Sequence, residues 1–200
     1  TYYIKASTAS IPPCEDIKPV TVTINPAPSL TITNPGPVCS PATVDLTLPA
    51  VTDGSTLNGA TLSYWEDAAA TIPLTNSNAV SVSGTYYIKA STASIPPCED
   101  IKPVVVTINP APTPSIVGST PVCEGLTEIY STPNTGNTYL WTVTGAGNVI
   151  SGSGTGDQVN VVWTTSGTIT IEETAGTCMS SDTMIVTVNP KPTTSAIYHD

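Results

Sequence analysis

A stretch of 28 residues occurs twice in this chain, almost letter for letter. Residues 1–28 (TYYIKASTASIPPCEDIKPVTVTINPAP) recur as residues 85–112, and the only difference is Thr21, which becomes Val105. An internal repeat of this length fixes the architecture before any other feature, because each copy belongs to one unit of an array. A catalytic site needs one copy of its residues, whereas a stalk needs many copies of a module. The repeat therefore favours a structural array.

A looser third copy sets the boundaries of the modules. The ends VTVTINPAPS, VVVTINPAPT and MIVTVNPKPT align without gaps, as do the starts GPVCSPATVDLTLPA and TPVCEGLTEIYSTPN. The alignment predicts the C-terminal part of a truncated module over 1–28, complete modules over 29–112 and 113–193, and a linker or the start of another module over 194–200. Modules of about 80 residues bury modest cores, so a covalent staple is expected.

The composition is that of an extracellular β protein. The chain has 20 Pro, 14 Gly and no Phe, and only 10 % of its residues are charged, with a formal net charge of −10. Typical soluble domains carry charge on roughly a quarter of their residues. The acidic balance argues against nucleic acid as a partner. No segment has the roughly 20 apolar residues of a membrane helix, so membrane insertion is not expected.

Hydrophobic alternation with a period of two predicts strands along the whole chain. In the last strand of each module, alternate residues are apolar and should face the core: Val20, Val22 and Ile24, then Val104, Val106 and Ile108, then Met184, Val186 and Val188. Thr21 and Val105 fall on the opposite face, where a substitution disturbs no packing. About seven short strands per module predict an all-β fold of tandem immunoglobulin-like β-sandwiches.

The modules are joined by Asn-Pro-Ala-Pro and Asn-Pro-Lys-Pro. Proline fixes its own φ and holds the preceding residue in an extended conformation. Such joints are semi-rigid spacers, so the sequence predicts an extended array of modules.

The five cysteines follow the repeat. Cys39 and Cys123 share a position in Val-Cys near the module start, whereas Cys14, Cys98 and Cys178 share one before the last strand. This pattern predicts structural disulfides formed in an oxidising compartment. Cys14 is left odd, and its partner is expected upstream of residue 1.

Two pairings fit this pattern. The favoured pairing joins Cys39 to Cys98 and Cys123 to Cys178, each within one module, by a bond worth roughly 4 kcal/mol. If the strands alternate strictly up and down, however, the first and last turns of a module lie at opposite ends. Cys39 would then lie nearer to Cys178 of the next module, and the bond would cross the joint.

No motif in the chain predicts catalysis: GxSxG, HExxH, a Gly-rich phosphate loop and an EF-hand loop are all missing. The carboxylate pairs Glu15-Asp16, Glu66-Asp67, Glu99-Asp100 and Glu172-Glu173 are interpreted mainly as solvated loop charges. A Ca²⁺ site at a joint, with help from Asp53, is the minor alternative, because calcium loops need a denser set of oxygen ligands. No other cofactor is expected.

Trp65 is the candidate ligand-binding residue. In LSYWED the alternation points Leu62 and Tyr64 inward, which leaves Trp65 outward, where its ring could stack on a sugar or cover a neighbouring module. A structural role is the favoured interpretation. Trp141 in TYLWTVTG is instead predicted to point into the core.

Both complete modules resemble a known group of proteins. VCEG…EIYS…YLWTVTGAGNVISGSGTGDQVNVVW…GTITIEETAGTCMSSDTMIVTVNPKP resembles the PKD-like modules of giant Bacteroidota cell-surface proteins, and VCSPATVDLT…YWEDAAATIPLTNSNAVSVSGTYYIKAS resembles their Ig-like repeats. Such arrays occur in gliding-motility adhesins of the SprB kind, which the type IX secretion system exports. The resemblance implies a cell-surface location and no catalytic residues. It also implies O-glycosylation at Asp-Ser/Thr before an apolar residue, which Thr183 fits.

The sequence therefore predicts a structural stalk segment of a large surface adhesin. Its expected partners are neighbouring modules of the same chain, other copies in a filament, or a surface polysaccharide. The alternatives are a carbohydrate-binding module that uses Trp65 and a non-catalytic spacer of a secreted enzyme. Lateral association through the outward residues Val105 and Ile185 is a further alternative.

Overall fold

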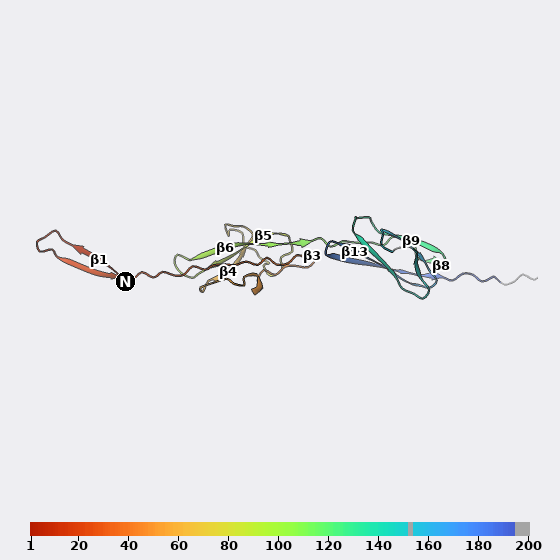
Figure 1. Cartoon of the computed structure of the whole chain (residues 1–200), viewed down its shortest axis with the longest axis horizontal. Coiled ribbons are helices and arrows are strands. Elements are labelled where there is room, and N and C mark those ends of the chain that lie inside the picture. Colours follow the sequence, from red (N-terminus) through yellow and green to blue (C-terminus); the bar gives the residue numbers. More distant parts are fainter. Residues whose placement is uncertain (152–153, 195–200) are drawn as a thin grey trace, which may run out of the picture. The chain divides into compact units, whose positions relative to one another are not determined.

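The computed structural model describes residues 1–151 and 154–194, and it forms two compact all-β units (Figure 1). The first unit consists of residues 1–35, 45–80 and 84–106, and the second consists of residues 36–44, 81–83 and 107 onward. The predicted all-β class is confirmed: the only helical element in the described ranges is the three-residue turn η1 (Pro49–Val51), so none there is long and apolar enough to span a bilayer. The predicted start of another module lies, apart from residue 194, outside the described residues.

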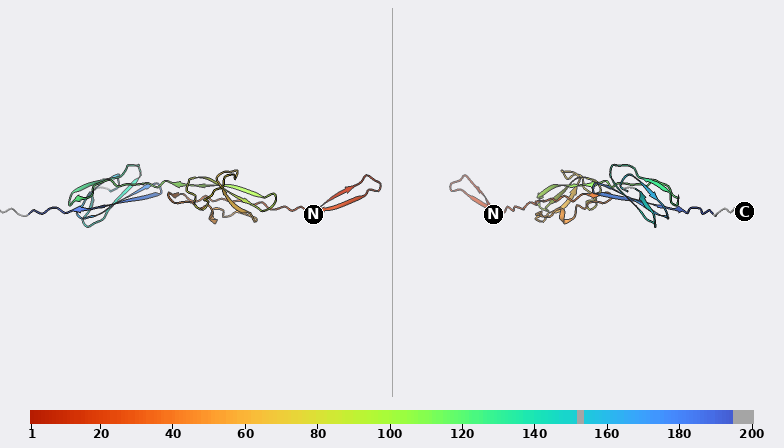
Figure 2. Two further views of the ribbon diagram at one scale, coloured as in Figure 1. Left: turned by 180° about the vertical axis from the view of Figure 1, so that it is seen from behind. Right: turned by 45° about the vertical axis from the view of Figure 1, so that its right-hand side comes forward.

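The two 28-residue copies fold into the same hairpin. Strands β1 (Tyr2–Ser7) and β2 (Glu15–Val20) pair antiparallel, and so do β5 (Gly84–Ser91) and β6 (Glu99–Val106), in the same register. The first hairpin is the red ribbon pair in Figures 1 and 2. In each, the N–H of the residue after the first strand donates to the cysteine carbonyl at 3.0 Å, from Thr8 to Cys14 and from Thr92 to Cys98.

The two hairpins differ in burial. In the second copy Val104 and Val106 are buried, as predicted, but in the first copy Val22 and Ile24 are 57 % and 88 % exposed. The prediction that the first copy faces a core is therefore wrong for this chain. Its hairpin is a sheet of only two strands, and a lone pair of strands offers no second layer against which apolar side chains can pack.

In the first unit, β4 (Thr61–Trp65) joins this second hairpin in a three-stranded sheet of order β4-β5-β6. Val105, the residue that differs between the copies, is 44 % exposed, so its predicted outward position is confirmed. The core beneath the sheet consists of Leu30, Leu46, Val51, Val80, Ile88, Ala90, Val104 and Val106.

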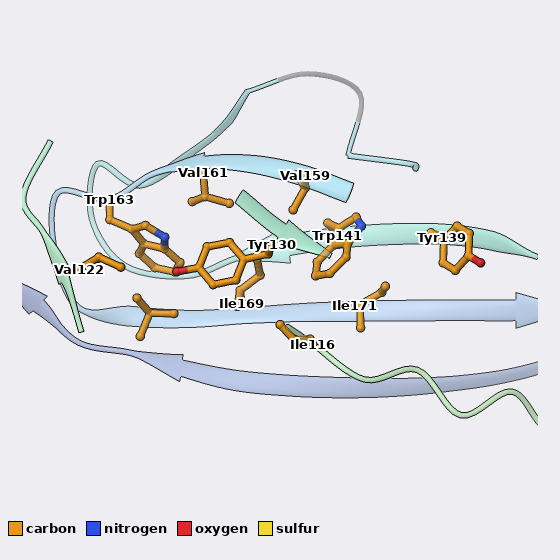
Figure 3. Close-up of a cluster of buried hydrophobic side chains, with 11 residues drawn as sticks. Ile116, Val122, Tyr130, Tyr139, Trp141, Val159, Val161, Trp163, Ile169 and Ile171 are labelled. Atoms are coloured by element: carbon orange, nitrogen blue, oxygen red, sulfur yellow. The ribbon is translucent and has the colours of Figure 1, made fainter. Parts of the chain in front are cut away.

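The second unit is built from two three-stranded sheets, β10-β13-β14 and β11-β12-β9. Its strands are β8 (Val122–Cys123), β9 (Thr127–Ser131), β10 (Thr138–Val143), β11 (Val149–Ser151), β12 (Gln158–Val162), β13 (Gly167–Ala175), β14 (Cys178–Val186) and β15 (Val188–Asn189). Figure 3 shows the core between them, with Tyr130 and Trp163 packed edge to face at 6.1 Å between ring centroids. Trp141 is 2 % exposed, which confirms its predicted inward position.

Two short parallel pairs form separate two-stranded sheets. Strand β3 (Val38–Cys39) pairs with β7 (Ile108–Asn109), and β8 pairs with β15. Each pair joins the Val-Cys start of one repeat to the Asn-Pro end of the same repeat. Both lie in the second unit, because residues 36–44 belong to it.

A carboxylate on the last long strand of each repeat fixes the backbone at the start of that repeat. Asp100 Oδ2 accepts the N–H of Leu30 at 2.7 Å, and Asp182 Oδ2 accepts the N–H of Ile116 at 2.9 Å; both bonds are partly buried. In the first hairpin the equivalent of Asp100 is Asp16, which is exposed and lies 3.7 Å from Lys18 Nζ. The same sequence therefore supplies a structural carboxylate in one copy and a surface charge in the other.

We predict that Asp100→Ala and Asp182→Ala each lower the free energy of unfolding of their own unit by about 1–3 kcal/mol, because a partly buried N–H loses its charged acceptor. Urea unfolding followed by tryptophan fluorescence measures the change. Asp16→Ala is the matched control and should stay within about 0.5 kcal/mol of the parent chain. Equal effects of Asp16→Ala and Asp100→Ala would contradict this role.

Candidate functional site

The parallel pair β3–β7 places Cys39 beside the end of its own repeat. Val38 lies opposite Ile108 and Cys39 opposite Asn109. The N–H of Val38 donates to the Thr107 carbonyl at 3.1 Å, and the N–H of Ser40 donates to the Asn109 carbonyl at 2.9 Å. We call this pair the first Cys–Asn clip.

The pair β8–β15 is a second Cys–Asn clip with the same register. Val122 lies opposite Val188 and Cys123 opposite Asn189. The N–H groups of Val122 and Glu124 donate to the carbonyls of Thr187 and Asn189, both at 2.9 Å. The clip is therefore a recurring feature of the repeat, produced by Val-Cys near the start and Thr-x-Asn-Pro at the end.

A disulfide joins the first clip to strand β14. Cys39 bonds to Cys178, with their Cα atoms 5.6 Å apart and a sequence separation of 139. Cys178 is fully buried and opens β14 at the tip of the β13–β14 hairpin, where Ala175 is its partner across the turn. The bond therefore links a segment of the repeat 29–112 to the last hairpin of the repeat 113–193.

This connectivity is the second of the two sequence-derived alternatives, and the favoured pairing within one module is not formed. The geometry of the second unit explains why Cys123 and Cys178 do not bond to each other. Cys178 begins β14 and Asn189 ends β15, eleven residues along extended chain, or about 36 Å. Cys123 lies beside Asn189, whereas a disulfide needs Cα atoms within about 7 Å of each other.

Cys14, Cys98 and Cys123 carry free thiols, and their surroundings differ. Cys14 and Cys123 are exposed, whereas Cys98 is half-buried. The Cys98 thiol donates to the Asn25 carbonyl at 3.8 Å and accepts from the Ser94 hydroxyl at 3.9 Å. None of these three cysteines has a disulfide partner within residues 1–151 and 154–194.

Most of the predicted carboxylate pairs are engaged by lysines or by turns. Glu15 binds Lys5 at 2.6 Å, and Glu99 binds Lys89 at 2.9 Å, a contact that holds the pKa of Glu99 below its ordinary value. The backbone N–H of Ile72, helped by Thr71, lowers the pKa of Asp67. Within the described ranges, no three or more His, Cys, Asp or Glu side chains come together as a metal-binding group.

The interpretation of the carboxylate pairs as solvated loop charges is wrong for Glu173, which lies buried in β13. Its side chain is 1 % exposed. It accepts hydrogen bonds from the Thr135 hydroxyl and, at 2.8 Å, from the Asn137 amide. The missed signal is the alternation of β13, which places Glu173 on the same face as the buried residues Ile169 and Ile171.

Trp65 is half-buried rather than fully outward. Residues 72–74 run back alongside β4, where Pro73 forms a bridge with Trp65 and the N–H of Leu74 donates to the Tyr64 carbonyl at 3.0 Å. The Trp65 indole N–H donates to the Ser63 hydroxyl at 2.9 Å. The returning segment pairs along the edge of β4 that faces away from β5, an arrangement that alternation alone does not describe.

Thr183 lies exposed on β14, and its hydroxyl is 3.0 Å from that of Thr170 on the neighbouring strand. Its predecessor Asp182 carries the structural contact to Ile116. The Asp-Thr-Met motif therefore has a structural use, and its glycosylation stays a prediction.

Comparisons with known proteins identify the second repeat. A family model described as a PKD-like domain matches residues 109–188. Comparison with curated protein sequences gives no significant match. The chain thus contains a PKD-like domain within a tandem of two β-sandwich units.

Several solved structures are similar to the chain at low sequence identity. The titin domains Z1Z2 in complex with telethonin are 14 % identical, with a TM-score of 0.35 over 85 % of this chain and 100 % of that one. The N-terminal eight Ig domains of Down syndrome cell adhesion molecule are 14 % identical, with a TM-score of 0.49 over 93 % and 31 %. Mouse cadherin-23 EC22-24 is 13 % identical, with a TM-score of 0.40 over 82 % and 67 %.

We predict that Cys39→Ser and Cys178→Ser destabilise the oxidised chain by similar amounts, about 2–5 kcal/mol, because each releases the same long loop in the unfolded state. The double variant should lose no more than either single variant. Cys98→Ser, at the same repeat position as Cys178, is the matched control and should lose far less. Thermal unfolding with and without reductant measures these effects, and a large loss in Cys98→Ser alone would contradict the connectivity.

Proposed function

We propose that this chain is a segment of an extracellular stalk that carries tension between a surface and a distal adhesive part. The single observation that supports this function most strongly is the Cys39–Cys178 bond, which crosses the boundary between two sequence repeats. A protein whose repeats act independently needs no such bond. A stalk under load needs one, because its weakest points are the connections between modules.

The bond controls how far the chain can be extended. A force applied at the two ends of the chain passes from Cys39 directly to Cys178 through sulfur, so the 138 residues between them are held out of the force path. Only the segments before Cys39 and after Cys178 can then be drawn out. The covalent link therefore limits the length gained when the folded units yield.

The hydrogen bonds of the clip could not provide this limit alone. The first Cys–Asn clip has two described backbone bonds, from Val38 and from Ser40. Each such bond contributes about 0.5–1.5 kcal/mol net, so the pair is easily parted by force. The disulfide holds the strand in place when those bonds break.

The sequence supports an extracellular setting for this stalk. Disulfides persist in oxidising compartments, which supports an extracellular location. Attachment to a cell surface, gliding motility and export by type IX secretion are supported by the resemblance to giant Bacteroidota adhesins. The partners we propose are neighbouring modules of the same chain and, at the distal end, a surface polysaccharide or another copy.

Single-molecule stretching of the chain tests this mechanism. Reduction should add about 480 Å of contour length, because the chain from Cys39 to Cys178, a sequence separation of 139, becomes extensible at roughly 3.3–3.6 Å per residue step. Cys39→Ser should show the longer length with or without reductant. Cys98→Ser is the matched control and should behave as the parent chain does.

Two results would contradict the proposal. Equal contour lengths before and after reduction would mean that the disulfide does not bear the force. A gain of roughly 400 Å released in two steps would mean that each module is closed by its own bond, so that the modules act as separate beads.

A further inference from the structure

The three free cysteines occupy the same positions in the repeat as the two cysteines of the Cys39–Cys178 bond. Cys123 corresponds to Cys39, whereas Cys14 and Cys98 correspond to Cys178. In this bond the start cysteine of one repeat joins the late cysteine of the next, and we take that pairing as the rule to be tested. Under this rule the partners of Cys98 and Cys123 belong to other modules of the same kind.

The surroundings of Cys98 match one half of the existing site. Cys178 opens β14 after the turn of the β13–β14 hairpin, and Cys98 immediately precedes β6 after the turn of the β5–β6 hairpin. The bond places Cys178 next to Cys39, which lies opposite Asn109. The Cys98 thiol contacts Asn25, and Asn25 is the equivalent of Asn109 in the first copy of the repeat.

The contact at Asn25 shows what is missing from this half-site. The Asn109 carbonyl accepts the N–H of Ser40, the residue that follows Cys39 in its strand. The equivalent carbonyl of Asn25 instead faces the Cys98 thiol at 3.8 Å. Beside Asn109, strand β3 occupies the edge. Beside Asn25, the hairpin cysteine Cys98 lies in the equivalent place, and no Val-Cys strand pairs there in the described residues.

Cys123 shows the complementary half. It lies in the second Cys–Asn clip, which reproduces the register and the backbone hydrogen bonds of the first. Its side chain is exposed, whereas Cys39 in the first clip is covered by the bond to the hairpin. The second clip thus contains the Val-Cys strand β8, but no hairpin cysteine is bonded to Cys123 in the described residues.

We propose that Cys98 forms a disulfide with the Val-Cys strand of another module of this repeat, which pairs with Asn25 as β3 pairs with Asn109. Cys123 accepts the hairpin cysteine of a further module in the same way. In each case two thiols lose two protons and two electrons and form one S–S bond. The electrons pass to a disulfide oxidant such as oxidised glutathione, which is reduced to two thiols.

The first copy of the repeat supplies an internal comparison. Cys14 has the same flanking sequence as Cys98, but it is exposed, and its thiol is not held against an asparagine carbonyl by any contact in the described residues. If the flanking sequence alone selected the late cysteine, a start cysteine would bond equally well to Cys14 and to Cys98. The contact of Cys98 with Asn25 favours Cys98.

An extended chain tests this choice. Because residues 1–28 repeat residues 85–112, fusing a copy of residues 29–84 ahead of Thr1 completes a module and adds one start cysteine. The extended protein is refolded in a buffer of reduced and oxidised glutathione. Its disulfides are then assigned by non-reducing peptide mapping, and its remaining thiols by alkylation.

The added cysteine is expected to bond to Cys98, and the free thiols to fall from three in the parent chain to two, Cys14 and Cys123. A bond between the added cysteine and Cys14, or an added cysteine that remains free, would overturn the proposal. The matched control carries serine in place of the added cysteine and should keep three free thiols. The Cys39–Cys178 bond in the same map reports that the chain has folded.

This inference rests on the proposed array only for the supply of a partner module. The stretching measurement tests the stalk on the 200-residue chain itself. A Cys14 link in the extended chain would therefore refute the rule for Cys98 while the stretching result on Cys39–Cys178 still stood.

Discussion

The pairing of Val-Cys with the Asn-Pro end of its own repeat is the constraint on which the rest of the arrangement depends. It places Cys39 beside Asn109 and Cys123 beside Asn189. Each late cysteine lies eleven residues before such an asparagine, so it is about a strand length away from the cysteine of its own repeat. In the repeat 113–193, closure by backbone pairing keeps Cys123 away from Cys178, which bonds instead to Cys39 of the preceding repeat.

Near-identical sequence does not produce identical roles in this chain. The hairpins of residues 1–28 and 85–112 share their register, yet only the second is covered by a sandwich core. Asp16 and Asp100, like Cys14 and Cys98, differ only in what packs against them. Such pairs separate the contribution of local sequence from that of tertiary contacts, and they supply the matched controls of an experiment.

The sequence could predict the fold because its signals are local. Alternation places Val104, Val106 and Trp141 in the core and Val105 outside it, and the aligned repeat ends mark the clips. The alternation of β13 also places Glu173 on the buried face, but the groups that bind its carboxylate, Thr135 and Asn137, are distant in the sequence. The pairing of Trp65 with the returning residues 72–74 is likewise not described by a period-two pattern. The cysteine partner likewise depends on a two-residue parallel pair, which is too short to give a periodic signal.

Non-reducing peptide mapping of the oxidised 200-residue chain tests most directly whether a disulfide links neighbouring repeats. We expect one peptide pair linked through Cys39 and Cys178, with Cys14, Cys98 and Cys123 recovered as thiols. Peptides linked through Cys39 and Cys98 and through Cys123 and Cys178 would contradict this expectation, because each repeat would then be closed by its own bond.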